Sequence, residues 1–131
     1  MKTYVSPMPS KDHAQTAIRG WASRTEQKHY EESLNSMYDA YLHAEDWDNA
    51  LFYVALMENH IIPIYGENSC EYATVLFKKG VLFKRGATSE EDKIEAAWLL
   101  IESKKRYEQL GLKNSECWKS CMKEIGELIG N

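Results

Sequence analysis

Thiols, imidazoles and clustered carboxylates are the side chains of this sequence that could carry out catalysis or bind a metal. Cys117 and Cys121 are four residues apart, so on a helix they share one face and could offer two ligands to one metal ion. Zinc takes about four ligands, and only Cys70 or a distant histidine could add to the pair. We therefore interpret the thiols as small buried or half-buried side chains and expect no metal.

The histidines and the acidic runs lack the arrangement of a catalytic centre. No histidine pairs with a cysteine or serine in a recognisable catalytic order; the four are His13, His29, His43 and His60. The runs Glu31-Glu32 and Glu90-Glu91-Asp92 contain adjacent carboxylates, but adjacent residues on a helix point apart, and acids near a helix start stabilise it. We expect no catalytic residue and no cofactor, and predict that the chain is not an enzyme.

The stretch from Tyr30 to Gly66 predicts the helices that would position a binding site. Apolar residues recur there at the i, i+3, i+4, i+7 spacing of a helix with one buried face, on both sides of a polar turn at Glu45-Asp46. The first series is Leu34, Met37, Tyr38 and Tyr41; the second is Trp47, Ala50, Leu51, Val54 and Met57. The pattern predicts two helices that pack against each other.

A second copy of this unit follows. The segment that begins at Tyr65-Gly66 is echoed by the one that begins at Leu110-Gly111, and Ala50 is echoed by Ala96, at an offset of about 45 residues. A repeated helical hairpin of this kind predicts an all-α, tetratricopeptide-like array of antiparallel helix pairs. We expect a flexible tail over 1–9 and one domain over 10–131: an N-terminal helix over 10–24, repeat one over 25–66, repeat two over 67–111 and a capping helix over 114–129.

Caps and buried faces follow from the same reading. Asn68 with Glu71, and Thr88 with Glu91, have the spacing of capping boxes at the starts of the two helices of repeat two. Gly80 is placed where a paired helix can approach closely. In the helix after Asp92 we expect the buried face to be Ile94, Ala97, Trp98 and Ile101, and among the tryptophans we assign Trp47, Trp98 and Trp118 to the core.

Composition limits the classes of partner and compartment. The net charge of −4 gives no overall reason to expect nucleic acid as a partner. No apolar run approaches the roughly 20 residues of a membrane-spanning helix. Three cysteines without a secretory leader fit a reducing compartment. We therefore expect an intracellular protein, cytoplasmic or nuclear, with no membrane contact.

Two surfaces are candidates for binding. The first helix of a tetratricopeptide unit lines the concave groove, so candidate partner contacts there are Asn35, Tyr38, Asp39, Tyr41 and Lys79. Tyr38 and Tyr41 could instead belong to the core, which is the favoured interpretation for the tyrosines of this helix. A basic patch for an acidic protein, or for RNA, could be formed by Lys78, Lys79, Lys84, Arg85, Lys104, Lys105 and Arg106, although charge runs on helices are usually solvated faces.

Three segments carry a resemblance to a known family. Trp47 to Tyr53, Tyr65 to Ser69 and the helix from Phe77 to Phe83 resemble the C-terminal helical repeat domain of SET and MYND domain lysine methyltransferases, which is itself tetratricopeptide-like. The resemblance extends from about Ser33 to Ile129. It implies a domain that closes over a substrate cleft or contacts partners without doing chemistry. The cofactor segment and zinc-binding cysteines of the SET and MYND modules are not found in this sequence.

The sequence thus favours a non-catalytic protein–protein interaction domain, an adaptor or scaffold that binds a peptide or helix of another protein. Two alternatives stay open: the substrate-recognition lobe of a SET and MYND type methyltransferase, and an RNA-associated adaptor that uses the basic clusters. A homodimer through the first or last helix is also open.

Overall fold

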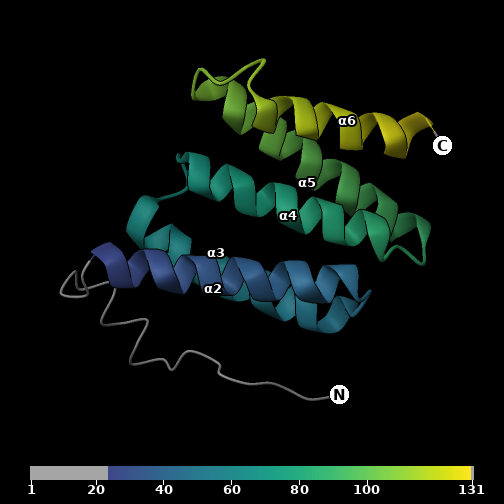
Figure 1. Cartoon of the computed structure of the whole chain (residues 1–131). Coiled ribbons are helices and arrows are strands. Elements are labelled where there is room, and N and C mark those ends of the chain that lie inside the picture. The colour runs from purple at the N-terminus through teal and green to yellow at the C-terminus, as the bar shows by residue number, and fades with distance from the viewer. Residues whose placement is uncertain (1–23, 131) are drawn as a thin grey trace. The chain divides into compact units, whose positions relative to one another are not determined.

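The computed structural model describes residues 24–130, which form five α-helices and contain no strand. The helices are α2 (Arg24–His43), α3 (Trp47–Tyr65), α4 (Cys70–Arg85), α5 (Glu90–Gln109) and α6 (Glu116–Gly130), as Figure 1 shows. The predicted all-α class is confirmed. The tail predicted over 1–9 and, apart from Arg24, the helix predicted over 10–24 lie outside the described residues. The chain divides into two compact units between Ile64 and Tyr65.

In the first unit, α2 and α3 run in opposite directions along each other. Tyr41, late in α2, stacks on Tyr53, early in α3, with ring centroids 5.7 Å apart. At the other end the Tyr30 ring meets the His60 ring edge-on, at 4.8 Å between centroids. The turn falls at the predicted place, since α2 ends at His43 and α3 begins at Trp47.

Different local interactions determine where α3 begins and where it ends. At its start the Asp46 carboxylate accepts hydrogen bonds from the Asn49 backbone N–H and side-chain amide, at 3.3 and 2.7 Å, so it satisfies a donor that the helix itself leaves open. At its end the helix continues only two residues beyond Pro63. Gly66 follows with φ of 82°, a left-handed backbone conformation in which glycine is the least strained residue. The predicted helix end after Pro63 is thus confirmed.

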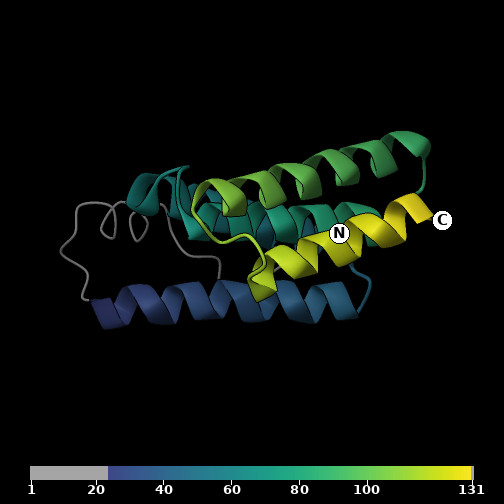
Figure 2. The same cartoon turned by 90° about the horizontal axis from the view of Figure 1, so that it is seen from above.

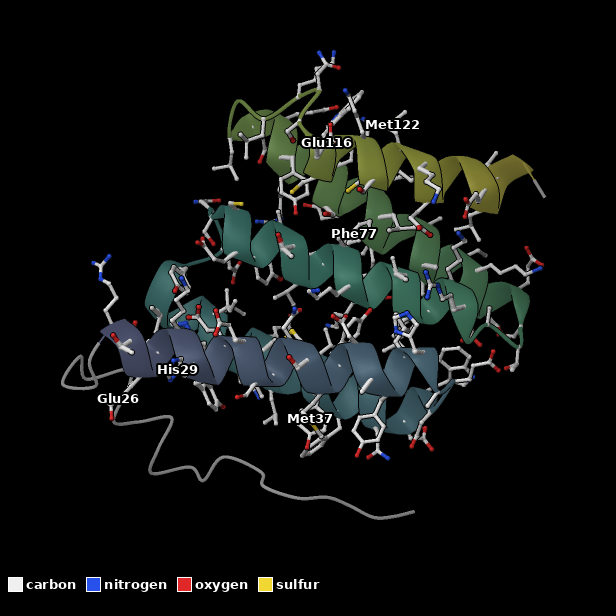
Figure 3. The ribbon with its side chains drawn as sticks, viewed as in Figure 1. Glu26, His29, Met37, Phe77, Glu116 and Met122 are labelled. Atoms are coloured by element: carbon white, nitrogen blue, oxygen red, sulfur yellow. The ribbon has the colours of Figure 1, made fainter. Side chains whose placement is uncertain are left out.

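In the second unit, α4, α5 and α6 follow one another with alternating direction (Figures 1 and 2). Its core includes a cluster of Ala73, Tyr107 and Cys121, one from each helix. Phe77, Leu112 and Trp118 pack around this cluster, and Figure 3 shows Phe77 on the side of α4 that faces α6. Two hydrogen bonds join α4 to α5, a buried one from Ser103 Oγ to the Ala73 carbonyl and a partly buried one between Thr74 Oγ1 and the Tyr107 hydroxyl, both at 2.7 Å.

A glycine permits the close approach of α4 to α5. A Cβ atom built on Gly80 would lie 2.7 Å from Leu100 Cγ and 3.3 Å from the Leu100 backbone nitrogen, both closer than ordinary van der Waals contact. Leu100 is completely buried, so its side chain has little room to move away. The close approach predicted at Gly80 is confirmed.

Serine caps all three helices of the second unit. Ser69, Ser89 and Ser115 each accept a hydrogen bond from the backbone N–H three residues later, at 3.1 to 3.2 Å. The caps predicted at Asn68 and Thr88 are therefore wrong by one residue, because the serine hydroxyl, and not the preceding side chain, reaches the open donor. Thr88 contributes differently, since its backbone N–H donates to the Asp92 carboxylate at 3.0 Å.

Candidate partner-binding surface

Two of the three thiols, Cys70 and Cys121, are not activated. Cys121 is buried and donates to Ser103 Oγ at 3.4 Å, whereas Cys70 and Cys117 are exposed. Burial raises the pKa of Cys121, and partial desolvation together with the negative Glu71 raises the pKa of Cys70. A raised pKa lowers the fraction of reactive thiolate at neutral pH. Among residues 24–130, no group of three or more His, Cys, Asp or Glu is arranged to hold a metal ion.

The described histidines lie in ordinary structural positions. His60 is buried on α3, and its Nε2 lies 2.9 Å from the Glu31 carboxylate on α2, so this pair joins the two helices of the first unit. His43 Nδ1 lies 2.8 Å from the Asp39 carbonyl oxygen, one turn earlier in α2. His29 is exposed near the start of α2 (Figure 3), and His13 lies outside the described residues.

Four of the five predicted partner contacts lie on α2. Asp39 is exposed, and Asn35 and Tyr41 are half-buried, so each can still meet a partner. Tyr38 is only 2% exposed, and in this structure it is a core residue of the first unit, which leaves no surface for a partner. Lys79 lies half-buried on α4, in the second unit.

Ion pairs take up much of the predicted basic patch. Lys84 Nζ lies 2.6 Å from the Glu124 carboxylate and also contacts Glu127, both on α6. Lys104 pairs with Glu108 at 3.0 Å, and Arg106 pairs with Glu102 at 3.2 Å. Arg85 and Lys105 remain exposed, and Lys78 and Lys79 are half-buried. Lys84, Lys104 and Arg106 are therefore engaged within the second unit, and Lys78 and Lys79 have interactions as well.

Hydrogen bonds that lower the pKa of three carboxylates are expected to make the protein sensitive to acid. A hydrogen bond from the Thr88 backbone lowers the pKa of Asp92, one from the Trp118 indole lowers that of Glu108, and one from Lys84 lowers that of Glu127. Because these pKa values are lower in the folded chain than in the unfolded chain, the unfolded chain takes up protons first as the pH falls. The stabilisation is complete above the ordinary carboxyl range and is lost as the pH falls through the lowered values.

We therefore expect the midpoint of urea unfolding to fall steadily between about pH 5 and pH 3. The Glu108→Gln variant should show a shallower fall, because it has no proton to take up at this position. Glu116→Gln serves as the control, since the Glu116 side chain is 94% exposed, and it should keep the slope of the unchanged chain. Equal slopes for all three proteins would contradict the assignment of this acid sensitivity to Glu108.

The outward face of α5 carries an apolar stripe that was expected to be core. Ile94, Trp98 and Ile101 are 63%, 58% and 41% exposed, so the prediction that Trp98 is buried is wrong. Their spacing of four and three residues places them on one side of the helix over a length of about 10 Å. The buried side of α5 is instead formed by Ala96, Leu99, Leu100, Ser103 and Tyr107. Trp47 and Trp118, the other two tryptophans assigned to the core, are each half-buried.

Carboxylates border the first half of this stripe. Glu90 and Glu91 precede Ile94 by four and three residues, and Glu95 precedes Trp98 by three, so all three lie beside the apolar side chains. All three are exposed, and none forms an ion pair within residues 24–130. We use the name α5 stripe for Ile94, Trp98 and Ile101, and acidic rim for Glu90, Glu91 and Glu95.

Periodicity alone could not identify the α5 stripe as a surface. The helix has two largely apolar series, and the outward one contains the largest side chain, Trp98, so the pattern favours it as the core. Which series is buried depends on α4, because Leu100 packs closely on Gly80 and Ser103 donates a hydrogen bond to the Ala73 carbonyl. The one available hint was the presence of two complete apolar series on a single helix.

Comparison of the chain with known protein families, curated proteins and solved structures gave no match. Within the described residues, no helix combines the length and the apolar character needed to cross a membrane.

Proposed function

We propose that this chain is a non-catalytic protein–protein interaction domain, with tetratricopeptide-like helix pairs, that binds a peptide or helix of another protein. The observation that carries the proposal is the α5 stripe, whose two isoleucines and one tryptophan are substantially exposed. Exposing contiguous apolar side chains to water costs free energy, so such a patch often marks a surface that a binding partner covers. Tryptophan in particular is enriched among the residues that dominate binding energies.

The polar side chains support the same proposal. The groups that could serve in chemistry hold helices together instead: His60 binds Glu31, Thr74 binds Tyr107, and Lys84 binds Glu124. The proposed resemblance to the helical repeat of SET and MYND methyltransferases also favours a binding role, because that domain contacts partners without doing chemistry.

Cross-linking followed by affinity purification and mass spectrometry tests the proposed function. We expect the intact chain to recover a protein whose cross-links fall at least about tenfold with either Trp98→Ser or the double variant Tyr41→Ala with Asp39→Lys. The variant Met122→Ala is the matched control, because Met122 is an exposed apolar residue on α6 (Figure 3) and should leave recovery unchanged. Recovery of the same proteins at the same levels by all variants would contradict the proposal.

A further inference from the structure

We propose that the α5 stripe docks a basic amphipathic helix, whose apolar face covers Ile94, Trp98 and Ile101 and whose lysines or arginines meet the acidic rim. This inference rests on the proposed function and names the chemistry of its partner. It follows from an apolar surface bordered by three exposed carboxylates on one helix, which outnumber the single exposed lysine there, Lys93.

The shape of the surface favours a helix as the occupant. The stripe runs along one side of α5 for about 10 Å and is a single row of side chains. An amphipathic helix laid along α5 would pack its own i, i+3, i+4, i+7 side chains beside Trp98 and cover the stripe along its length. Ala97, half-buried beside Trp98, leaves space there for a larger side chain of the partner.

The charges decide the sign of the partner. Within residues 24–130, Glu90, Glu91 and Glu95 form no ion pair, and Lys93 is the one exposed cation among them, so the exposed charges beside the first half of the stripe sum to −2. Glu102, further along the helix, is already paired with Arg106. An uncharged partner would exclude water from part of the rim without replacing the hydrogen bonds that water makes to the carboxylates, which costs free energy. Lysine or arginine at the flanks of the partner's apolar face would instead form ion pairs with the rim.

A second copy of this chain fits the same face less well. Among the described basic residues at the far end of the stripe, only Lys105 is exposed and without an ion pair, because Lys104 pairs with Glu108 and Arg106 with Glu102. A copy docked in the opposite direction would therefore offer one lysine to three carboxylates, and would leave the others facing an acidic helix. The charge count favours a foreign, basic partner.

Fluorescence anisotropy measures the binding of two synthetic peptides to the chain and tests the inference. Each peptide has about 18 residues, a length at which an isolated helix can form. Both peptides carry leucines at helical spacing; one has lysines at the flanking positions and the other has glutamates. We expect the intact chain to bind the lysine peptide and not the glutamate peptide, and its binding to weaken as salt is added. Equal binding of both peptides, or of neither, would overturn the inference.

Variants of the full chain locate the binding. Trp98→Ala should weaken the affinity for the lysine peptide by about 30-fold or more. The double variant Glu91→Gln with Glu95→Gln should weaken it by about threefold to tenfold. The matched control is Glu32→Gln with Asp48→Asn, which removes two exposed carboxylates from the first unit and should leave binding unchanged. Equal losses for both double variants would show a general charge effect and would overturn the assignment to the acidic rim.

Two further measurements separate the competing explanations. Sedimentation that shows a dimer of the intact chain, converted to a monomer by Trp98→Ala, would assign the stripe to a second copy and overturn the basic helix. Recovery of a cross-linked cellular partner that is lost with Tyr41→Ala and Asp39→Lys but kept by Trp98→Ser would preserve the proposed function and remove α5 as its site.

Discussion

Replacing Leu100 with alanine is expected to lower the free energy of unfolding of the α4–α6 unit by about 2–5 kcal/mol. Leu100 is completely buried on α5 and fills the space left by Gly80 on α4. Removing its branched end leaves a cavity, because the helices on each side are fixed by the Ser103 and Thr74 hydrogen bonds and cannot collapse fully. Urea unfolding monitored by circular dichroism measures the loss.

A second substitution tests the geometric reason. Gly80→Ala alone should destabilise, since the new methyl group would lie 2.7 Å from Leu100 Cγ and overpacking costs about 1–3 kcal/mol, more than the roughly 1 kcal/mol that alanine gains over glycine in a helix. In the Leu100→Ala background the same change should become stabilising, by up to about 1 kcal/mol, because the methyl group enters the cavity. If Gly80→Ala has the same effect in both backgrounds, the contact does not limit the approach of α4 to α5.

Replacing Lys84 with methionine is expected to destabilise the same unit by about 1–3 kcal/mol at neutral pH. The Lys84 side chain is 16% exposed and that of Glu124 is 11% exposed, so the carboxylate left behind has little access to water. Burial lowers the pKa of Lys84, but its hydrogen bonds to Glu124 and Glu127 raise it by more, so the ammonium is charged at neutral pH. Its loss also leaves two carboxylates of α6 one turn apart without their shared cation.

Two variants check this explanation of the Lys84 effect. Lys123→Met removes the same charge from a side chain that is 72% exposed and 3.9 Å from Glu127, and it should change the unfolding free energy by less than about 0.5 kcal/mol. Lys84→Met combined with Glu124→Leu should recover most of the lost stability, because the unpaired carboxylate is gone. A double variant as unstable as the single one would show that Lys84 acts through its packing alone.

The helices themselves were largely predictable from the sequence. The apolar spacing from Leu34 to Met57, the polar turn at Glu45-Asp46 and the position of Pro63 with Gly66 all depend on interactions within a few residues. The cap positions were missed by one residue, because asparagine and threonine are good caps by type, whereas the serine after each of them reaches the N–H three residues on. Type and spacing do not distinguish two neighbouring caps.

The surfaces could not be predicted in the same way, because they depend on residues far apart in the sequence. Lys84 was assigned to a basic patch, and only the return of α6 shows that Glu124 and Glu127 pair with it. Trp98 was assigned to the core, and only the contact of Gly80 with Leu100 shows that the other side of α5 faces inward. Whether Asn35, Asp39 and Tyr41 bind a partner stays a prediction.

The acidic rim has a consequence for the chain while no partner is bound. An exposed tryptophan between two isoleucines is a site at which copies of a protein can aggregate, and nearby charges of one sign oppose this by repulsion. Glu90, Glu91 and Glu95 would act as gatekeepers of this kind, and their effect adds to the net charge of −4 of the whole chain. The same three carboxylates would thus keep copies of the chain apart during synthesis and storage, and a basic partner would remove that repulsion when it binds.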